Sequence, residues 1–176
     1  MGNRLTGMIG SLVMLCFGAI SFYRFYNTGI VFFLLMTFRD VLASWFLIGR
    51  REKIDQFSNK TIALISYLSS AVPLFYFKGI VNSQVLISIS SLLSILGFSI
   101  STLALIELGQ SFGVSPANRG RITTGVYKIT NHPMYFGYII SEFGFLIINP
   151  SNILIFLISS SLYFYRATIE NKRLNI

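Results

Sequence analysis

The sequence predicts an all-α membrane protein, a polytopic transmembrane helical bundle of five to six spans. Of its 176 residues, 53% are hydrophobic and only 11% are charged, and the mean hydropathy is +0.68. In an ordinary soluble domain about a quarter of the residues are charged. The apolar residues form runs long enough to cross a bilayer, and most charged residues fall between those runs. Together these observations exclude a soluble globular fold.

Six apolar segments are the candidate spans. They occupy residues 5–22, 29–48, 61–77, 80–106, 133–148 and 153–165. Pro73 predicts a kink in the third segment, because proline removes a helical hydrogen bond. Pro150 and Asn152 lie in a short turn between the last two segments, which we therefore expect to form a tight helical hairpin. The sixth helix should emerge from the membrane as residues 166–173.

Basic residues are distributed unevenly among the loops. If both termini and the loops after the second and fourth segments face the cytoplasm, only Arg24 and Lys78 lie on the other side. The cytoplasmic side then holds Arg4, Arg50, Arg51, Lys53, Lys60, Arg119, Arg121, Lys128, Arg166, Lys172 and Arg173. The net charge of +8 therefore indicates membrane orientation and not nucleic-acid binding. We expect a multi-pass protein of the inner membrane if the source is bacterial, or of the endoplasmic reticulum if it is eukaryotic.

The polar stretch before the fifth segment concentrates the chemistry of the chain, and it contains the only histidine, His132. Pro133 is placed to open a helix, because proline is favoured at the first helical position. The backbone N–H groups of Met134, Tyr135 and Phe136 would then lack helical partners and carry the positive end of the helix dipole. Such a helix start, beside an imidazole and a phenol, predicts a site for a carboxylate or phosphate.

Charged residues inside apolar segments are costly and mark functional or structural sites. Arg39 and Asp40 lie in the second segment and point to different faces of a helix, so we expect partners on other helices that hold the bundle together. Glu142 lies in the fifth segment. It could line a cavity that opens from the polar stretch, or accept a hydrogen bond in the core. Glu107 lies near the end of the fourth segment.

Arg166 and Glu170 are four residues apart on the last helix and share one face. Periodicity alone favours a solvated surface pair. Cys16 and His132 are the only residues of their types, so we expect no metal site of the His/Cys kind.

Several short motifs in the second half of the chain follow one another in a specific order. They are Leu108-Gly109, Thr124-Gly125-Val126-Tyr127, His132-Pro133-Met134-Tyr135-Phe136-Gly137, Asn149-Pro150 and Arg166-x-x-x-Glu170. This order resembles the isoprenylcysteine carboxyl methyltransferase family over roughly the C-terminal two fifths of the chain. Two positions differ from the usual family pattern: Asn131 stands where arginine is usual, and Asn171 where a second glutamate is usual.

The resemblance implies a methyltransferase that binds S-adenosyl-L-methionine on the cytoplasmic face and takes a lipophilic or lipidated acceptor from the bilayer. Residues 1–107 would form the N-terminal transmembrane helices and residues 108–176 the catalytic region. The cofactor-binding residues that it implies are Arg119, Gly120, Arg121, Ile122, Tyr127, His132, Pro133, Met134, Tyr135 and Glu170. It assigns Arg166 to the acceptor. Relatives continue past the position of Leu174, so prenylcysteine as the acceptor stays open.

The chemistry of the acceptor decides whether the enzyme needs a base. A carboxylate acceptor needs none, and Arg166 could hold it. An amine, phenol or thiol acceptor must lose a proton, and Glu142 would then be the catalytic base.

Two other functions stay open. Membrane sterol reductases resemble the same C-terminal helices but use a nicotinamide dinucleotide, for which Arg119, Arg121 and Lys128 would be the phosphate partners. A small transporter or assembly subunit could use the charged residues inside the spans as a polar path, although this leaves the order of the motifs unexplained.

Overall fold

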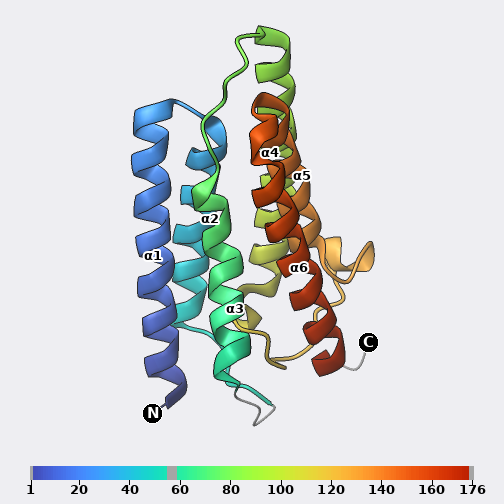
Figure 1. The fold of residues 1–176 in the computed structure, drawn as a ribbon. Coiled ribbons are helices and arrows are strands. Elements are labelled where there is room, and N and C mark those ends of the chain that lie inside the picture. The colour runs from blue at the N-terminus through green and yellow to red at the C-terminus, as the bar shows by residue number, and fades with distance from the viewer. Residues whose placement is uncertain (1, 55–58, 175–176) are drawn as a thin grey trace.

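The computed structural model describes residues 2–54 and 59–174 (Figure 1). Within these residues the chain forms six α-helices with short 3-10 turns and no β-strand. The α-helices are α1 (Gly2–Thr28), α2 (Val31–Ile48), α3 (Lys60–Ala71), α4 (Gln84–Leu108), α5 (Pro133–Ile148) and α6 (Ile153–Leu174). The 3-10 turns are η1 (Val72–Phe75), η2 (Gly109–Ser111), η3 (Gly125–Lys128) and η4 (Pro150–Asn152). The all-α prediction is confirmed, with one helix in each of the six apolar segments.

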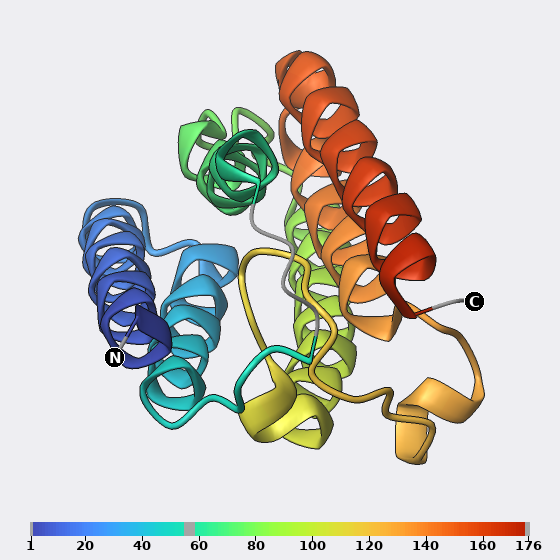
Figure 2. The ribbon, with the colours of Figure 1, turned by 90° about the horizontal axis from the view of Figure 1, so that it is seen from below.

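Four segments are long and apolar enough to cross a membrane. They are Leu5–Thr28, Val31–Ile48, Gln84–Ser111 and Pro150–Leu174. The other two apolar helices, Lys60–Phe75 and α5, are shorter. With its 16 residues, α5 extends about 24 Å, less than the roughly 30 Å hydrocarbon core. It lies between α4 and α6 (Figure 2), so protein covers much of its surface and it need not match the bilayer thickness. The chain is therefore a multi-pass membrane protein.

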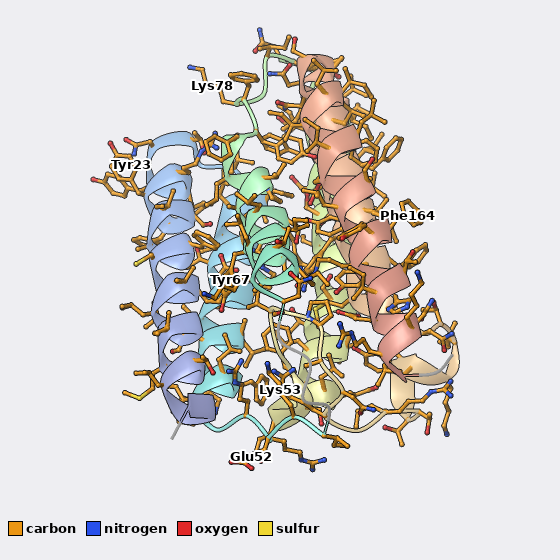
Figure 3. All side chains as sticks on the ribbon, turned by 60° about the horizontal axis from the view of Figure 1, so that its bottom comes forward. Tyr23, Glu52, Lys53, Tyr67, Lys78 and Phe164 are labelled. Carbon is orange, nitrogen blue, oxygen red and sulfur yellow. The ribbon has the colours of Figure 1, made fainter. Side chains whose placement is uncertain are left out.

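The molecule has two distinct ends. Both termini, the loop after α2 and the loop after α4 lie at one end (Figure 1). Lys53 lies near this end, whereas Lys78 lies at the opposite end, and Phe164 points outward from α6 (Figure 3). This grouping of the basic loops agrees with the arrangement expected from the sequence. The side of the membrane on which this end lies stays a prediction.

Pro73 ends a helix where the sequence predicted a kink. α3 stops at Ala71, and Pro73 lies in the first turn of η1. Proline has no backbone N–H, and its ring clashes with the preceding helical turn. The α-helical hydrogen bonds therefore cannot continue past this point. Residues 76–83 then form an extended segment, here called the strap, which leads to α4 (Figure 1).

The turn between α5 and α6 is bonded to this strap. Asn149 donates its Nδ2 to the carbonyl oxygen of Lys78 at 2.7 Å. Asn152, which is fully buried, exchanges two hydrogen bonds with the backbone of Phe77, at 2.8 and 3.0 Å. The predicted hairpin is confirmed, and its asparagines satisfy backbone groups that lipid could not satisfy.

α4 and α5 approach so closely that their glycines have no room for a side chain. A Cβ atom at Gly97 would collide with the carbonyl oxygen of Gly137 and the backbone nitrogen of Ser141. A Cβ atom at Gly144 would lie 2.8 Å from the carbonyl oxygen of Ser90. Small residues at helix interfaces permit this backbone contact in membranes. The contact fixes the position of α5, which carries the candidate site at its start.

Arg39 and Asp40 bond to each other, so the expectation that they point apart and do not satisfy each other is wrong, whereas the expected partner on another helix exists for Arg39. The Nε and Nη2 atoms of Arg39 donate to Oδ1 of Asp40 at 2.8 and 2.5 Å, and both side chains are buried. The long, flexible arginine side chain folds back to its neighbour although the two Cβ atoms point apart. Its guanidinium also lies over the ring of Tyr138 on α5, 5.1 Å from the ring centroid.

Candidate active site

The loop between α4 and α5 closes the end of the bundle that carries the termini. Glu107, near the end of α4, accepts a hydrogen bond from the backbone N–H of Val126 with both carboxylate oxygens, each at 3.1 Å. Gly125 has φ of +49°, and a Cβ atom there would collide with the Glu107 carboxylate. Glycine is therefore required for both reasons. The Glu107 carboxylate thus holds η3 against the end of α4, which gives this charged residue a structural role.

Arg166 of α6 holds the same loop from the inside. Its Nη2 donates to the carbonyl oxygen of Val114 at 2.7 Å, and its Nη1 donates to Oγ of Ser69 on α3 at 2.8 Å. Arg166 is only 4% exposed. The surface-pair interpretation of Arg166 and Glu170 is therefore wrong, because α6 turns this face toward α3, α5 and the loop instead of toward solvent.

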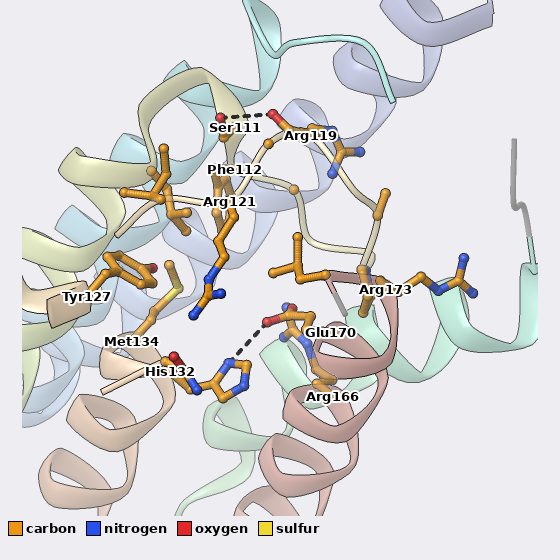
Figure 4. Close-up of a pocket in the computed structure, with 18 of the residues that line it drawn as sticks. Ser111, Phe112, Arg119, Arg121, Tyr127, His132, Met134, Arg166, Glu170 and Arg173 are labelled. Atoms are coloured by element: carbon orange, nitrogen blue, oxygen red, sulfur yellow. Dashed lines mark hydrogen bonds and ion pairs between the residues drawn. The ribbon is translucent and has the colours of Figure 1, made fainter. Parts of the chain in front are cut away.

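A pocket lies where this loop, the start of α5 and the end of α6 meet (Figure 4). Its empty volume, including the space at its open mouth, is about 830 Å³. The sequence-predicted residues that line it are Arg119, Gly120, Arg121, Ile122, Tyr127, His132, Met134, Tyr135, Arg166 and Glu170. The fold thus brings together residues from three separate parts of the chain.

Two predicted site residues do not line this pocket. Pro133 opens α5, as the sequence predicted, and is buried behind the pocket wall. Glu142 lies farther along α5, is 2% exposed, and accepts hydrogen bonds in the core. The alternative in which Glu142 accepts hydrogen bonds in the core is the one that the structure supports.

Glu170 is held at the centre of a polar cluster. Tyr135 donates its hydroxyl to Oε1 of Glu170 at 2.5 Å. Nδ1 of His132 lies 3.5 Å from Oε2 of the same carboxylate (Figure 4). Nε2 of His132 lies 2.6 Å from Oδ1 of Asn171. Asn171 thus fixes the second nitrogen of the imidazole.

The electrostatic surroundings favour a protonated His132 and a neutral Tyr127. Burial lowers the pKa of His132, but its contacts with Glu170 and Asn171 and the negative charge of Glu170 raise it more, so the net shift is upward. Burial raises the pKa of Tyr127, and the charges of Glu170 and Glu107 raise it further. The pocket therefore offers a carboxylate, an imidazole with a raised pKa and a phenol.

The start of α5 differs in one detail from the expectation. The N–H of Phe136 donates to the carbonyl oxygen of His132 at 3.2 Å, so it is already part of the helix. The expectation that it lacks a partner is wrong, because His132 is the cap residue and its carbonyl accepts the first helical bond. Met134 and Tyr135 carry the N–H groups at the helix start, and both residues line the pocket.

The pocket also contains residues that the sequence did not single out as ligands. They are Leu108, Ser111, Phe112, Gly113, Ser115, Pro116, Ala117, Asn131, Arg173 and Leu174. Most of them lie in the segment that follows α4. For the residues between 111 and 117, the nearest sequence signal was the Leu108-Gly109 motif, because this stretch has neither periodicity nor ionisable groups. Among residues 2–54 and 59–174, no group of three His, Cys, Asp or Glu side chains could hold a metal ion.

Comparison with known proteins identifies a family. No curated protein and no solved structure matches the chain. The family model described as phospholipid methyltransferase matches residues 79–175, which is more than half of the chain and includes α4, α5, α6 and the whole pocket loop. The chain therefore belongs to the phospholipid methyltransferase family, the family of membrane methyltransferases like isoprenylcysteine carboxyl methyltransferase.

Proposed function

We propose that this membrane methyltransferase uses S-adenosylmethionine and methylates a lipophilic acceptor that carries a carboxylate. Family membership supports methyl transfer. The observation that carries the cofactor assignment is the Glu170 carboxylate, held by Tyr135 and His132 in a pocket whose wall includes arginines. The acceptor would come from the bilayer, and the pocket end would face the cytoplasm, where the cofactor is available.

The residues of the pocket match the charged groups of S-adenosylmethionine. Its amino group and sulfonium would suit Glu170 and the aromatic face of Tyr127. Its carboxylate would suit Arg121, which extends into the pocket toward His132 (Figure 4), and the N–H groups at the start of α5.

The residues of the chain would position the reactants rather than exchange protons. When bound, the cofactor supplies a methyl group on a positively charged sulfur. The role of the protein is then to orient the acceptor and exclude water. Arg166 suits a carboxylate, because its guanidinium is buried and its Nε has no hydrogen-bond partner.

The position of Glu142 favours a carboxylate over an acceptor that must lose a proton. The hydroxyls of Tyr76 and Tyr163 already bond to its oxygens at 2.9 and 2.6 Å, and it lies outside the pocket lining. It is therefore badly placed to act as a base, and a carboxylate acceptor needs none.

The two rival functions receive less support. The family match is to methyltransferases, not to reductases. A transport path would need connected polar groups, whereas Arg39 and Asp40 bond to each other and Glu142 bonds to hydroxyl groups.

Calorimetric titration of the purified protein tests the cofactor. We expect binding of S-adenosylmethionine and S-adenosylhomocysteine, and none of NADPH. Glu170→Gln should weaken binding at least tenfold, because a hydrogen bond to a charged group contributes about 1.5–3 kcal/mol. Lys172→Gln, on the same helix end but outside the pocket lining, is the matched control and should bind normally. Binding of NADPH alone, or equal affinity of wild type and Glu170→Gln, would overturn the assignment.

Methyl transfer to different lipids tests the acceptor. Transfer of a labelled methyl group to a prenylated cysteine or a fatty acid should exceed transfer to phosphatidylethanolamine. Arg166→Lys should lose more of the transfer than of the cofactor affinity, because an ammonium lacks the two-donor fork that matches a carboxylate. Some loss of affinity is expected as well, since a lysine cannot keep both bonds to Ser69 and Val114. Faster transfer to the amine lipid would refute the carboxylate and leave the cofactor assignment intact.

A further inference from the structure

Glu142 is the centre of a closed set of hydrogen bonds deep in the bundle. It accepts from the hydroxyl of Tyr76 at 2.9 Å, from the hydroxyl of Tyr163 at 2.6 Å, and from the hydroxyl of Ser159. These donors come from the strap after η1 and from α6, whereas Glu142 itself is on α5. A carboxylate is costly at this depth, and three donors are more than a core contact needs.

One of these donors belongs to a column of stacked rings that reaches the pocket. The ring of Tyr163 stacks on that of Tyr135, with centroids 5.9 Å apart and planes 9° apart. The ring of Tyr135 stacks in turn on the imidazole of His132, at 5.7 Å and 23°. Tyr135 also donates its hydroxyl to Glu170. The column therefore connects the buried Glu142 to the two polar groups at the centre of the pocket.

Helical spacing explains why the column exists. Tyr135, Tyr138 and Glu142 lie three and four residues apart on α5 and share one face. Tyr163 and Glu170 lie on the facing side of α6, separated by two turns. The hydrogen bond from Tyr163 to Glu142 fixes the register of α5 and α6 at one end of their interface. The hydrogen bond from Tyr135 to Glu170 fixes it at the other end.

We infer that Glu142 is a positioning residue of the pocket, which acts through Tyr163 and Tyr135 to fix Glu170 and His132. Without the bond to Glu142, the Tyr163 ring loses the contact that fixes its hydroxyl end, and only ring packing holds it against Tyr135. Tyr135 then loses the packing that aims its hydroxyl at Glu170. The role in cofactor binding rests on the proposed function, whereas the effect on His132 is a property of the protein alone.

Two tyrosine variants separate this role from a merely structural one. Tyr163→Phe and Tyr76→Phe each remove one hydroxyl donor from the same carboxylate. Only Tyr163 belongs to the ring column, because the Tyr76 ring packs on Phe32 and Phe145. Both variants should lose similar thermal stability. Only Tyr163→Phe should alter the pocket.

The first readout needs no cofactor. His132 is the only histidine, so its imidazole gives a single titrating signal in an NMR spectrum of the protein in detergent. In Tyr163→Phe and Glu142→Gln its pKa should fall toward the ordinary value of 6.5, because Glu170 is less well aligned. In Tyr76→Phe it should stay near the wild-type value. Equal shifts in Tyr163→Phe and Tyr76→Phe, or no shift in either, would overturn the inference.

The charged and titratable groups around His132 are common to all these variants. Glu170 and Arg166 face the pocket from α6, and Tyr135 from α5. The loop contributes Arg119, Arg121 and Tyr127, and the end of α6 contributes Arg173. None of them is substituted, and Tyr163→Phe and Tyr76→Phe remove no carboxylate or cation. A difference between these two variants in the His132 titration therefore reports the alignment of the charged groups and not their number, whereas Glu142→Gln also removes a carboxylate.

The second readout is the affinity for S-adenosylmethionine. Tyr163→Phe should bind it about threefold to tenfold more weakly than Tyr76→Phe, the range expected for the loss of about one hydrogen bond. If wild type does not bind the cofactor, the proposed function fails and the His132 titration still decides the inference. If wild type binds and the two variants bind alike, the role of Glu142 in cofactor binding is refuted while the proposed function stands.

Discussion

His132 lies between a carboxylate and an amide, so its proton is coupled to the structure of the pocket. Glu170 faces one ring nitrogen and Asn171 the other. The net upward shift of the His132 pKa means that the folded protein holds this proton more tightly than the unfolded chain. The stabilisation is complete below the unfolded pKa, near 6.5, and is lost as the pH rises through the higher folded pKa.

Thermal unfolding across a pH series tests this coupling. We expect the difference in unfolding temperature between wild type and His132→Asn to be largest near about pH 5 and to shrink toward about pH 9. Lys128→Gln, an exposed change in the same loop, should show a constant difference. A difference that grows with pH would mean that the pKa of His132 is lowered in the folded state.

At the scale of elements, the contact between α4 and α5 supports the whole site. α5 presents His132 and Tyr135 to the pocket, and its glycines set its distance from α4. At Gly137, a Cβ atom would collide with the hydroxyl of Ser101 and the carbonyl oxygen of Gly97. The α4 backbone cannot move aside as a flexible side chain could. An added methyl group at Gly137 would therefore push the two helices apart.

Gly137→Ala should therefore destabilise the protein. Alanine stabilises a helix by up to about 1 kcal/mol relative to glycine, but overpacking a close interface costs about 1–3 kcal/mol. The net free energy of unfolding should therefore decrease. The unfolding temperature of the purified protein measures the outcome. Gly49→Ala is the control, because φ there is −99° and the nearest atom to a new Cβ is 3.7 Å away. Equal stability of the two variants would contradict the close approach of α4 and α5.

At the scale of the molecule, the basic loops and the pocket share one end of the bundle. Lys53 lies near this end and Lys78 near the other (Figure 3). The positive-inside rule predicts that the pocket end is cytoplasmic. This is also the side on which a soluble cofactor such as S-adenosylmethionine would reach the pocket.

Labelling of single cysteines in intact cells tests this orientation. In a Cys16→Ser background, Thr123→Cys lies on the pocket loop and Asn82→Cys on the strap at the other end, and both positions are exposed. A reagent that cannot cross the membrane should label Asn82→Cys and leave Thr123→Cys unlabelled until the membrane is opened. The reverse pattern would invert the topology and remove cytoplasmic access to the pocket.

The sequence by itself determined the helices and the motifs at the pocket. Helices α2, α5 and α6 begin within two residues of the predicted positions, because long apolar runs, prolines and asparagine turns act over a few neighbouring residues. The motif residues His132, Tyr135 and Glu170 line one pocket. α1 extends past the predicted end to Thr28, and its Arg24 donates to the carbonyl oxygens of Leu74 and Tyr76, partners that no local pattern encodes.

Only the tertiary structure decided which partners the charged side chains have. Arg39 folds back onto Asp40, Arg166 is buried on the loop and α3, and Glu142 bonds to hydroxyls away from the pocket. Helical periodicity predicts which residues share a face of a helix, but it does not predict which other segment packs against that face. Those partners come from segments more than fifteen residues distant in the chain, except Asp40, so their identity depends on how the helices pack.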